Sequence, residues 1–222
     1  LIGLLLISAC APQSNEAPYP YSAPENKSVL IIGDSISYGY TPFVVEGMPD
    51  FKITHIPENA RNSFYTSKNI DRWLDLYPEG FGTILWNNGM WNCIHGKSPE
   101  PGHPADQPEE NLFTSLEDYE ADLRLIASRL TRTGSRVIFL TTTFIPNNSQ
   151  GGILEVGYER ELNEIAKRVL PEYGIEVFDI HPLSESLPSS MRMYGYDIHY
   201  TSEGSAALSE FVINALKNRR LK

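Results

Sequence analysis

The sequence predicts an α/β protein: a three-layer α/β/α sandwich built on a parallel five-stranded sheet. Two observations lead to this prediction. Short apolar, β-branched runs alternate with amphipathic stretches of helical period, and polar residues suited to chemistry follow the first three runs. Strands buried on both faces read as continuous apolar runs, and right-handed crossovers place helices on both sides of the sheet. The expected strands are 29–32, 52–56, 83–86, 136–141 and 175–178.

The expected helices carry apolar residues at spacings of three and four, which gather on one helix face. They are 67–77, 114–130, 158–170 and 202–216. Thr114 and Glu117 are spaced as a capping box, which would satisfy free N–H groups at the start of the second of these helices. In such sheets ligands bind beyond the carboxyl ends of the strands. A Pro-rich segment, 92–111, is long enough to predict a lid or rim beside that edge.

Length and charge narrow the class of protein. The chain has 222 residues, which suits one globular domain, expected here at residues 28–222. Its net charge of −10 repels nucleic acid and anionic lipid, so neither is an expected partner. Neutral ligands, such as a sugar ester or a small acyl ester, remain compatible with this charge.

The first residues resemble the end of a bacterial lipoprotein signal peptide. An apolar run, 1–9, closes with Ile7, Ser8 and Ala9, directly before Cys10. The resemblance implies that residues 1–9 are the remainder of a truncated signal peptide, and that Cys10 is lipidated. The protein would then lie in the cell envelope and touch the membrane only through its lipid anchor. The alternative is a buried apolar strand or helix that ends in cysteine.

A tether is expected between this anchor and the domain. Residues 10–27 are rich in proline and almost free of aliphatic side chains, so they cannot bury enough surface to offset ordering entropy. A lipidated Cys10 would leave Cys93 without an intramolecular disulfide partner.

The strongest chemical signal is Gly33-Asp34-Ser35-Ile36, directly after the first expected strand. A serine at a strand-to-helix turn projects its hydroxyl at the helix N-terminus, where free N–H groups favour negative charge. That environment suits attack on an ester and binding of the resulting oxyanion. The alternative is a plain Asp/Ser helix cap.

A second signal lies near the C-terminus, where His199 follows Asp197 by two residues. A serine nucleophile needs a base, and a neutral imidazole is well matched to that task at working pH. A carboxylate close by can orient the ring and stabilise its charged form. The alternative is a histidine in a surface loop.

Together these segments resemble the SGNH, or GDSL-type, esterase and lipase family over residues 29–216. Three segments carry the resemblance: Gly33-Asp34-Ser35, Asn87-Asn88-Gly89 after the third strand, and His199 followed by a Thr-x-x-Gly run at 201–204. The resemblance implies a flavodoxin-like parallel sheet, with Ser35 as nucleophile and His199 as base. It also implies an oxyanion hole formed by the N–H groups of Ser35 and Phe64 and by the Asn88 amide. It implies no metal and no cofactor.

The sequence departs from the family pattern at several points, among them Ile36 where leucine is usual and Trp86 where a glycine is usual. Phe64 stands where a glycine is usual, and Gly89 stands where the aspartate after the asparagine is usual. The acid usually lies three residues before the histidine, where this chain has Tyr196, so Asp197 is displaced by one residue. Asp179, after the fifth strand, is another candidate acid, and the absence of any triad acid is a further possibility.

The function that these residues predict is a serine hydrolase that cleaves carbohydrate O-acetyl or short-chain acyl esters through an acyl-enzyme on Ser35. The expected partner is a small-molecule or glycan ester. The alternative is a non-catalytic glycan- or ligand-binding lipoprotein on the same scaffold. A phosphate site at 33–37 fits least, because that loop has one glycine before the serine and no lysine. His95 and His103 lack metal-pair spacing. Trp86 and Trp91 suit either a pocket wall or the core.

Overall fold

The computed structural model describes residues 26–94, 114–147, 149 and 153–218. Several predictions concern residues outside this range. They are the signal peptide at 1–9, the lipidation site Cys10, nearly all of the tether, most of the 92–111 segment, and His95 and His103.

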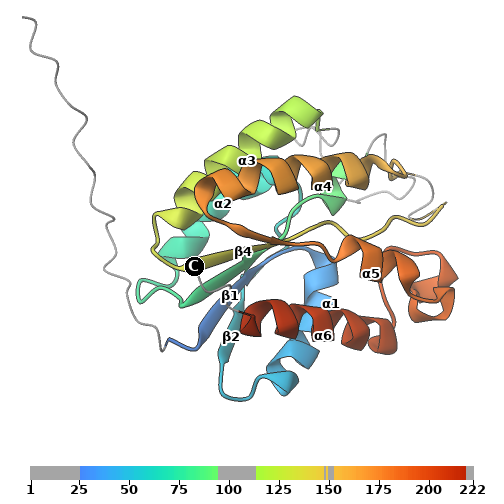
Figure 1. The fold of residues 1–222 in the computed structure, drawn as a ribbon, viewed down its shortest axis with the longest axis horizontal. Coiled ribbons are helices and arrows are strands. Elements are labelled where there is room, and N and C mark those ends of the chain that lie inside the picture. The colour runs from blue at the N-terminus through green and yellow to red at the C-terminus, as the bar shows by residue number, and fades with distance from the viewer. Residues whose placement is uncertain (1–25, 95–113, 148, 150–152, 219–222) are drawn as a thin grey trace, which may run out of the picture.

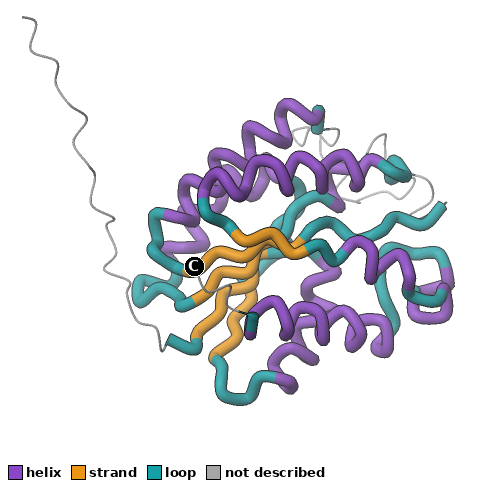
Figure 2. Tube along the Cα trace, viewed as in Figure 1, coloured by secondary structure: helices purple, strands orange, loops and turns teal. Residues whose placement is uncertain are grey.

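A parallel five-stranded sheet forms the centre of the molecule, with helices on both of its faces (Figures 1 and 2). The strand order is β2-β1-β3-β4-β5, and all neighbouring strands are parallel. This confirms the predicted three-layer α/β/α sandwich. The strands are β1 (Ser28–Ile32), β2 (Lys52–His55), β3 (Thr83–Trp86), β4 (Arg136–Leu140) and β5 (Glu176–Phe178).

The helices divide between the two faces. Helices α1 and α6 pack against each other on one face, and α2, α3 and α4 form a layer on the other (Figure 1). The helices are α1 (Ser35–Gly47), α2 (Ser63–Asp75), α3 (Leu116–Thr131), α4 (Tyr158–Val169), α5 (His181–Ser186) and α6 (Ser202–Lys217). Among the residues placed by the structure, no helix combines the length and apolarity needed to cross a membrane.

Two predicted helix starts are wrong. Helix α2 begins four residues earlier than expected, because the Asn62 side chain caps it by accepting from the Tyr65 N–H. Helix α3 is capped by Ser115, which accepts from the Asp118 N–H, and not by a box of Thr114 with Glu117. In both cases hydrogen bonding by a short polar side chain sets the boundary, and apolar periodicity does not report it.

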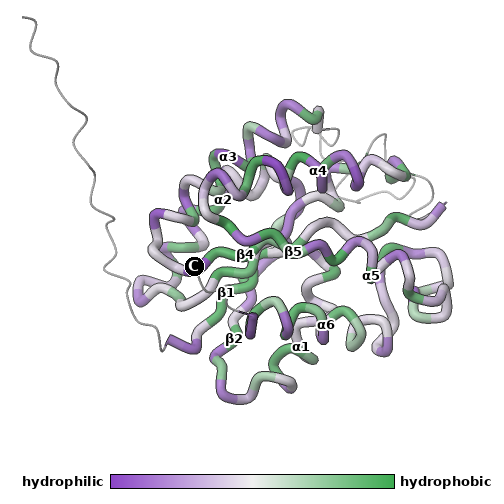
Figure 3. Tube along the Cα trace, in the orientation of Figure 1, coloured by the Kyte–Doolittle hydropathy of each residue, from purple (hydrophilic) through white to green (hydrophobic). Residues whose placement is uncertain are grey.

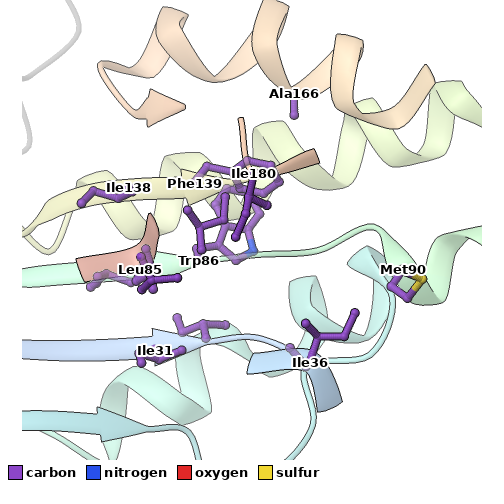
Figure 4. Packing of buried hydrophobic residues seen from close by; sticks show 14 of the residues in the cluster. Ile31, Ile36, Leu85, Trp86, Met90, Ile138, Phe139, Ala166 and Ile180 are labelled. Atoms are coloured by element: carbon purple, nitrogen blue, oxygen red, sulfur yellow. The ribbon is translucent and has the colours of Figure 1, made fainter. Parts of the chain in front are cut away.

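The core lies between the sheet and its two helical layers. Hydrophobic residues concentrate along the strands (Figure 3), and the central strands β1, β3 and β4 are almost wholly buried. Trp86 packs edge-on against Phe139, with ring centroids 4.9 Å apart, in the cluster of Figure 4. Trp86 is fully buried, so it belongs to the core and does not line a pocket.

The strand order creates a switch point between β1 and β3. From β1 the chain moves to one side of the sheet to form β2, and it then returns past β1 to form β3 on the other side. The connections that leave the carboxyl ends of β1 and β3 therefore diverge and leave room for a ligand between them. Gly33-Asp34-Ser35 follows β1 and Asn87-Asn88 follows β3, so both signals from the sequence flank this point.

Candidate active site

Ser35 is the first residue of α1. Asp34 is the N-cap, and one of its carboxylate oxygens accepts from the Ile36 N–H at 3.0 Å. The cap predicted as an alternative reading is therefore present, and it is formed by Asp34. The Ser35 N–H has no hydrogen-bond partner among the described residues. It belongs to the group of free donors that helix N-termini direct toward negative charge.

The Asp34 carboxyl group, next to Ser35 in the chain, is buried. Its second oxygen, Oδ2, has no hydrogen-bond partner among the residues described. Burial raises the pKa of Asp34, and the Ile36 N–H and the charge of His199 act in the opposite direction.

Ser35, His199 and Asp197 form a continuous hydrogen-bonded chain. Ser35 Oγ lies 2.9 Å from His199 Nε2, and His199 Nδ1 lies 2.7 Å from Asp197 Oδ1. The carboxylate requires the proton on Nδ1, which leaves Nε2 as the acceptor for the serine hydroxyl. Ser35 and His199 are each partly exposed, so both can be reached from solvent.

The local turn explains how an acid two residues before the histidine reaches the ring. Asp197 Oδ1 accepts both the backbone N–H of His199, at 2.8 Å, and the ring Nδ1–H. An aspartate that bonds the backbone two residues on is a common turn device, and here the same oxygen also orients the imidazole. The alternative acid, Asp179, pairs instead with Lys167 Nζ at 2.7 Å and Thr141 Oγ1 at 2.8 Å.

Asn88 is buried just beyond the carboxyl end of β3 and links this segment to the loop before α2 and to α2 itself. Its Nδ2 donates to Arg61 O at 3.0 Å and to Thr66 Oγ1 at 2.9 Å, and its Oδ1 accepts from Trp86 Nε1. The loop before α2 also reaches the nucleophile turn, since the Ala60 N–H donates to Gly33 O at 3.0 Å. The structure thus gathers Asn88 and this loop at the carboxyl edge beside Ser35.

The Asn88-Gly89 pair departs from the family pattern for a steric reason. Gly89 has a φ of +151°, and a Cβ there would lie 1.8 Å from Thr142 Oγ1. Aspartate cannot occupy this position without displacing the Thr142 side chain, which lies just beyond β4. The tight approach lets the Thr142 and Tyr119 hydroxyls both bond the Asn88 carbonyl oxygen.

Phe64 is the second residue of α2, and its ring is 48% exposed. The preceding Ser63 N–H is taken by Asn92 Oδ1, and the following Tyr65 N–H by Asn62 Oδ1. The Phe64 N–H has no partner in the described part of the chain. A phenylalanine supplies the same backbone donor as a glycine, so its side chain does not remove that donor.

A second Ser–His pair lies close by and was not foreseen from the sequence. Ser37 Oγ lies 2.6 Å from His55 Nε2, where His55 is the last residue of β2. The ring Nδ1 faces the carbonyl of Ile56 at 2.7 Å, and no carboxylate takes that place. Nothing in the sequence indicates this contact, because the two residues lie eighteen positions apart in different elements.

Two further side chains of reactive type, His181 and Cys93, are buried. His181 is buried with its Nε2 3.2 Å from Glu159 Oε1. Burial raises the pKa of the Cys93 thiol well above its usual range, so Cys93 is a poor nucleophile. No cluster of three or more His, Cys, Asp or Glu side chains suited to a metal ion occurs within the described ranges.

Comparison with solved structures finds the same fold in several proteins described as esterases or acylhydrolases. A lipase/acylhydrolase from Enterococcus faecalis superposes with a TM-score of 0.67 at 13% identity, over 86% of this chain and 95% of that one. The acetyl xylan esterase AlAXEase superposes with a TM-score of 0.63 at 12% sequence identity, over 85% of this chain and 99% of that one. A variant of an acetyl xylan esterase from Geobacillus stearothermophilus superposes with a TM-score of 0.64 at 14% sequence identity, over 88% of this chain and 96% of that one.

These likenesses show a shared fold and nothing finer, because the identities are low. A scan against protein-family models produced no match, and a search of curated protein sequences produced no significant match. The chain therefore has the α/β/α fold of these lipases and esterases, with a Ser–His–Asp chain at the carboxyl edge of its sheet.

Proposed function

We propose that the protein is a serine esterase of the SGNH type that cleaves carboxylic esters through an acyl-enzyme on Ser35. The observation that supports this most directly is the hydrogen-bonded chain from Ser35 Oγ through the His199 ring to Asp197. Its nucleophile stands at a helix N-terminus on the carboxyl edge of the sheet, where electrostatics favour an oxyanion.

The reaction proceeds in two halves. Ser35 Oγ attacks the acyl carbon while His199 Nε2 takes the hydroxyl proton, and Asp197 stabilises the resulting imidazolium. The tetrahedral intermediate collapses, the bond to the alcohol oxygen breaks, and His199 gives its proton to the departing alkoxide. A water molecule then attacks the acyl-serine, with His199 again as base, and releases the carboxylic acid and free Ser35.

The proposed oxyanion donors are the N–H groups of Ser35 and Phe64 and the side-chain amide of Asn88. The two N–H groups have no partner among the described residues, which supports their availability. Asn88 donates to Arg61 O and Thr66 Oγ1, so it must exchange one of these bonds for the oxyanion. Catalytic hydrogen bonds often form only when the substrate is bound.

Turnover of p-nitrophenyl acetate by Ser35→Ala tests the proposal. We expect the variant to lose ester hydrolysis down to the background rate, while Ser37→Ala keeps it, since Ser37 is buried beside the second histidine. Equal turnover by wild type and Ser35→Ala would contradict the mechanism. If the wild type were inert on every ester offered, the alternative of a binding protein on this scaffold would replace the enzyme.

We further propose that Cys10 carries a lipid that anchors the domain to a bacterial membrane through the 10–27 tether. The support comes from the sequence alone, from the apolar run that ends in Ile7-Ser8-Ala9-Cys10. Expression of the gene in bacteria fed a labelled fatty acid should label the wild-type protein and leave Cys10→Ser unlabelled. Equal labelling of the two would contradict an anchor at this cysteine.

A further inference from the structure

A short loop beside His199 exposes three large apolar side chains. Met193 is 42% exposed, Tyr194 77% and Tyr196 52%, and Tyr194 is the most exposed large apolar residue in the described part of the chain. The proposed mechanism uses none of them. We refer to Met193–Tyr196 as the tyrosine loop.

The base of the tyrosine loop is hydrogen-bonded to the proposed catalytic residues. The Met193 N–H donates to His199 O at 3.0 Å, and the Asp197 N–H donates to Met193 O at 3.0 Å. An antiparallel bridge between Arg192 and Tyr200 closes the hairpin below it. The two tyrosines therefore project from a turn whose ends are the triad acid and the backbone of the triad histidine.

The turn holds Tyr194 in an unusual backbone conformation. Its φ is +54° and its ψ is +9°, and Gly195 follows with a φ of +78°. A left-handed conformation is costly for an aromatic residue, and such outliers cluster where a side chain must be aimed. Glycine at 194 would relieve the cost, so the tyrosine at this position calls for a functional explanation.

The support beneath the tyrosine loop is rigid. The Arg192 side chain is 5% exposed, and its guanidinium lies over the Tyr200 ring at 4.9 Å and the Phe144 ring at 5.3 Å. It also donates to the Ser184 carbonyl. The tip is thus presented on a packed base, which lowers the entropy lost when a ligand binds.

We propose that Tyr194 and Tyr196 form a platform on which a sugar ring, the alcohol part of the ester, is held beside Ser35. This rests on the proposed function and names its substrate class. The ring centroids lie 6.4 Å apart with a 35° tilt, so both rings keep an open face. Tyrosine combines an apolar ring with a hydrogen-bonding hydroxyl, which matches the apolar C–H face and hydroxyl edge of a sugar.

The composition of the tyrosine loop favours a sugar over a fatty acyl chain, whereas the net charge of −10 is compatible with either neutral ester. Within the tyrosine loop, Met193 is the sole aliphatic side chain, whereas a lipid site is expected to be lined mainly by aliphatic groups.

Paired substrates test the platform. The specificity constants are measured on acetylated xylobiose and on p-nitrophenyl acetate, for the wild type, Tyr194→Ala, Tyr196→Ala and the double variant. We expect the ratio of kcat/KM, sugar ester over aryl ester, to fall about tenfold in the double variant, because stacking of this kind contributes roughly that factor. The loss should lie in KM more than in kcat. Tyr194→Phe with Tyr196→Phe should restore most of the ratio, because the rings remain.

Leu76→Ala is the matched control. Leu76 is 51% exposed and follows the C-terminal end of α2, away from the nucleophile turn, so its truncation should leave the ratio unchanged. An unchanged ratio in the double tyrosine variant would overturn the platform. So would a wild type that cleaves p-nitrophenyl octanoate and not acetylated xylobiose, since that would point to an acyl-chain site.

Direct binding separates this proposal from the esterase. Unacetylated xylobiose is titrated into the Ser35→Ala protein, with and without the two tyrosine substitutions. Binding that is lost with the tyrosines supports the platform even if no ester is hydrolysed. Hydrolysis that depends on Ser35, together with a ratio indifferent to the tyrosines, would keep the esterase and reject the platform.

Discussion

Two serines on one helix, two residues apart, each meet a histidine. Ser35 Oγ lies 2.9 Å from His199 Nε2, and Ser37 Oγ lies 2.6 Å from His55 Nε2. Measured by the serine–histidine distance alone, the second pair is the tighter one. The two pairs differ in what holds the other ring nitrogen and in what surrounds them.

The His199 ring is held by the Asp197 carboxylate, and the ring is partly open to solvent. The His55 ring is held by the Ile56 carbonyl and packs against Tyr38 at a tilt of 38°, with ring centroids 4.4 Å apart. Burial lowers the pKa of His55, so that ring resists taking a proton. Ser37 is 2% exposed, and Asp34 O competes with the ring for its single hydroxyl proton.

The two pairs share a serine–histidine contact and differ in the features that we propose to make Ser35 the nucleophile. The base must take up a positive charge during the reaction. A carboxylate stabilises that charge strongly, whereas a carbonyl group in a buried site stabilises it only weakly. The serine must also be open to substrate and stand at the free N–H groups of a helix start. Ser35 is the first residue of α1, whereas Ser37 lies within its first turn.

Replacement of the two histidines gives the largest expected contrast. His199→Gln should lower kcat for p-nitrophenyl acetate by about 10⁵- to 10⁶-fold, as for the loss of a catalytic base. His55→Gln should retain most of kcat, because its ring only supports the α1 start. Similar losses of kcat in the two variants would contradict the assignment of His199, and not His55, as the catalytic base.

Removal of the Asp197 charge, which only the Ser35–His199 pair has beside its ring, should give the second largest effect. Asp197→Asn keeps the shape and the bond to the His199 N–H but removes the charge, and kcat should fall by up to about 10⁴-fold. Steady-state kinetics should place the loss in kcat and leave KM nearly unchanged. Asp179→Asn is the control, since Asp179 pairs with Lys167. An equal loss in Asp179→Asn would reverse the assignment of the acid.

Asn88 should contribute less than the charged residues. Asn88→Ala should lower kcat about 10²- to 10³-fold, which is the typical cost of losing one oxyanion donor. Because Asn88 is buried and hydrogen-bonded to Arg61, Thr66 and Trp86, the thermal unfolding of the variant must be measured alongside its activity. Thr66→Val removes one competing acceptor and frees an amide proton, so it should not lower kcat. If Asn88→Ala were folded and fully active, Asn88 would be a structural residue only.

The smallest expected effect is a pH dependence of stability from His55. Because burial lowers its folded pKa, the unfolded chain binds a proton more readily below about pH 6.5. Stability from this group is therefore present at higher pH and is lost as pH falls through the unfolded pKa. Urea unfolding at pH 7.5 and 5.5 should show a larger loss for the wild type than for His55→Gln, by at most about 1.4 kcal/mol per pH unit. Equal losses would place the His55 pKa at its ordinary value.

Much of the fold followed from local sequence patterns. Runs such as Val29–Ile32 predict buried strands because their period and β-branched composition are local properties. Helix starts were less accessible, since the caps of α2 and α3 depend on which of several neighbouring polar residues turns inward. Asn62 and Ser115 take those roles, and apolar spacing does not distinguish them from adjacent residues.

The site was predictable only in part. Ser35 and His199 stood out because each lies in a short segment of recognisable form, yet their contact spans 164 residues. The displaced Asp197 remained open because the turn through Tyr194 and Gly195, with positive φ at both, determines which acid reaches the ring. The Ser37–His55 pair left no signal, because a contact between a helix and a neighbouring strand end arises only when the sheet assembles.

Labelling with a fluorophosphonate, followed by peptide mapping, tests directly whether Ser35 is the activated serine. A fluorophosphonate reacts with serines activated by a working base, so it discriminates between the two serines of α1. We expect one labelled site, Ser35, with labelling lost in Ser35→Ala and retained in Ser37→Ala. Label on Ser37, or a folded wild-type protein that takes no label at all, would contradict it.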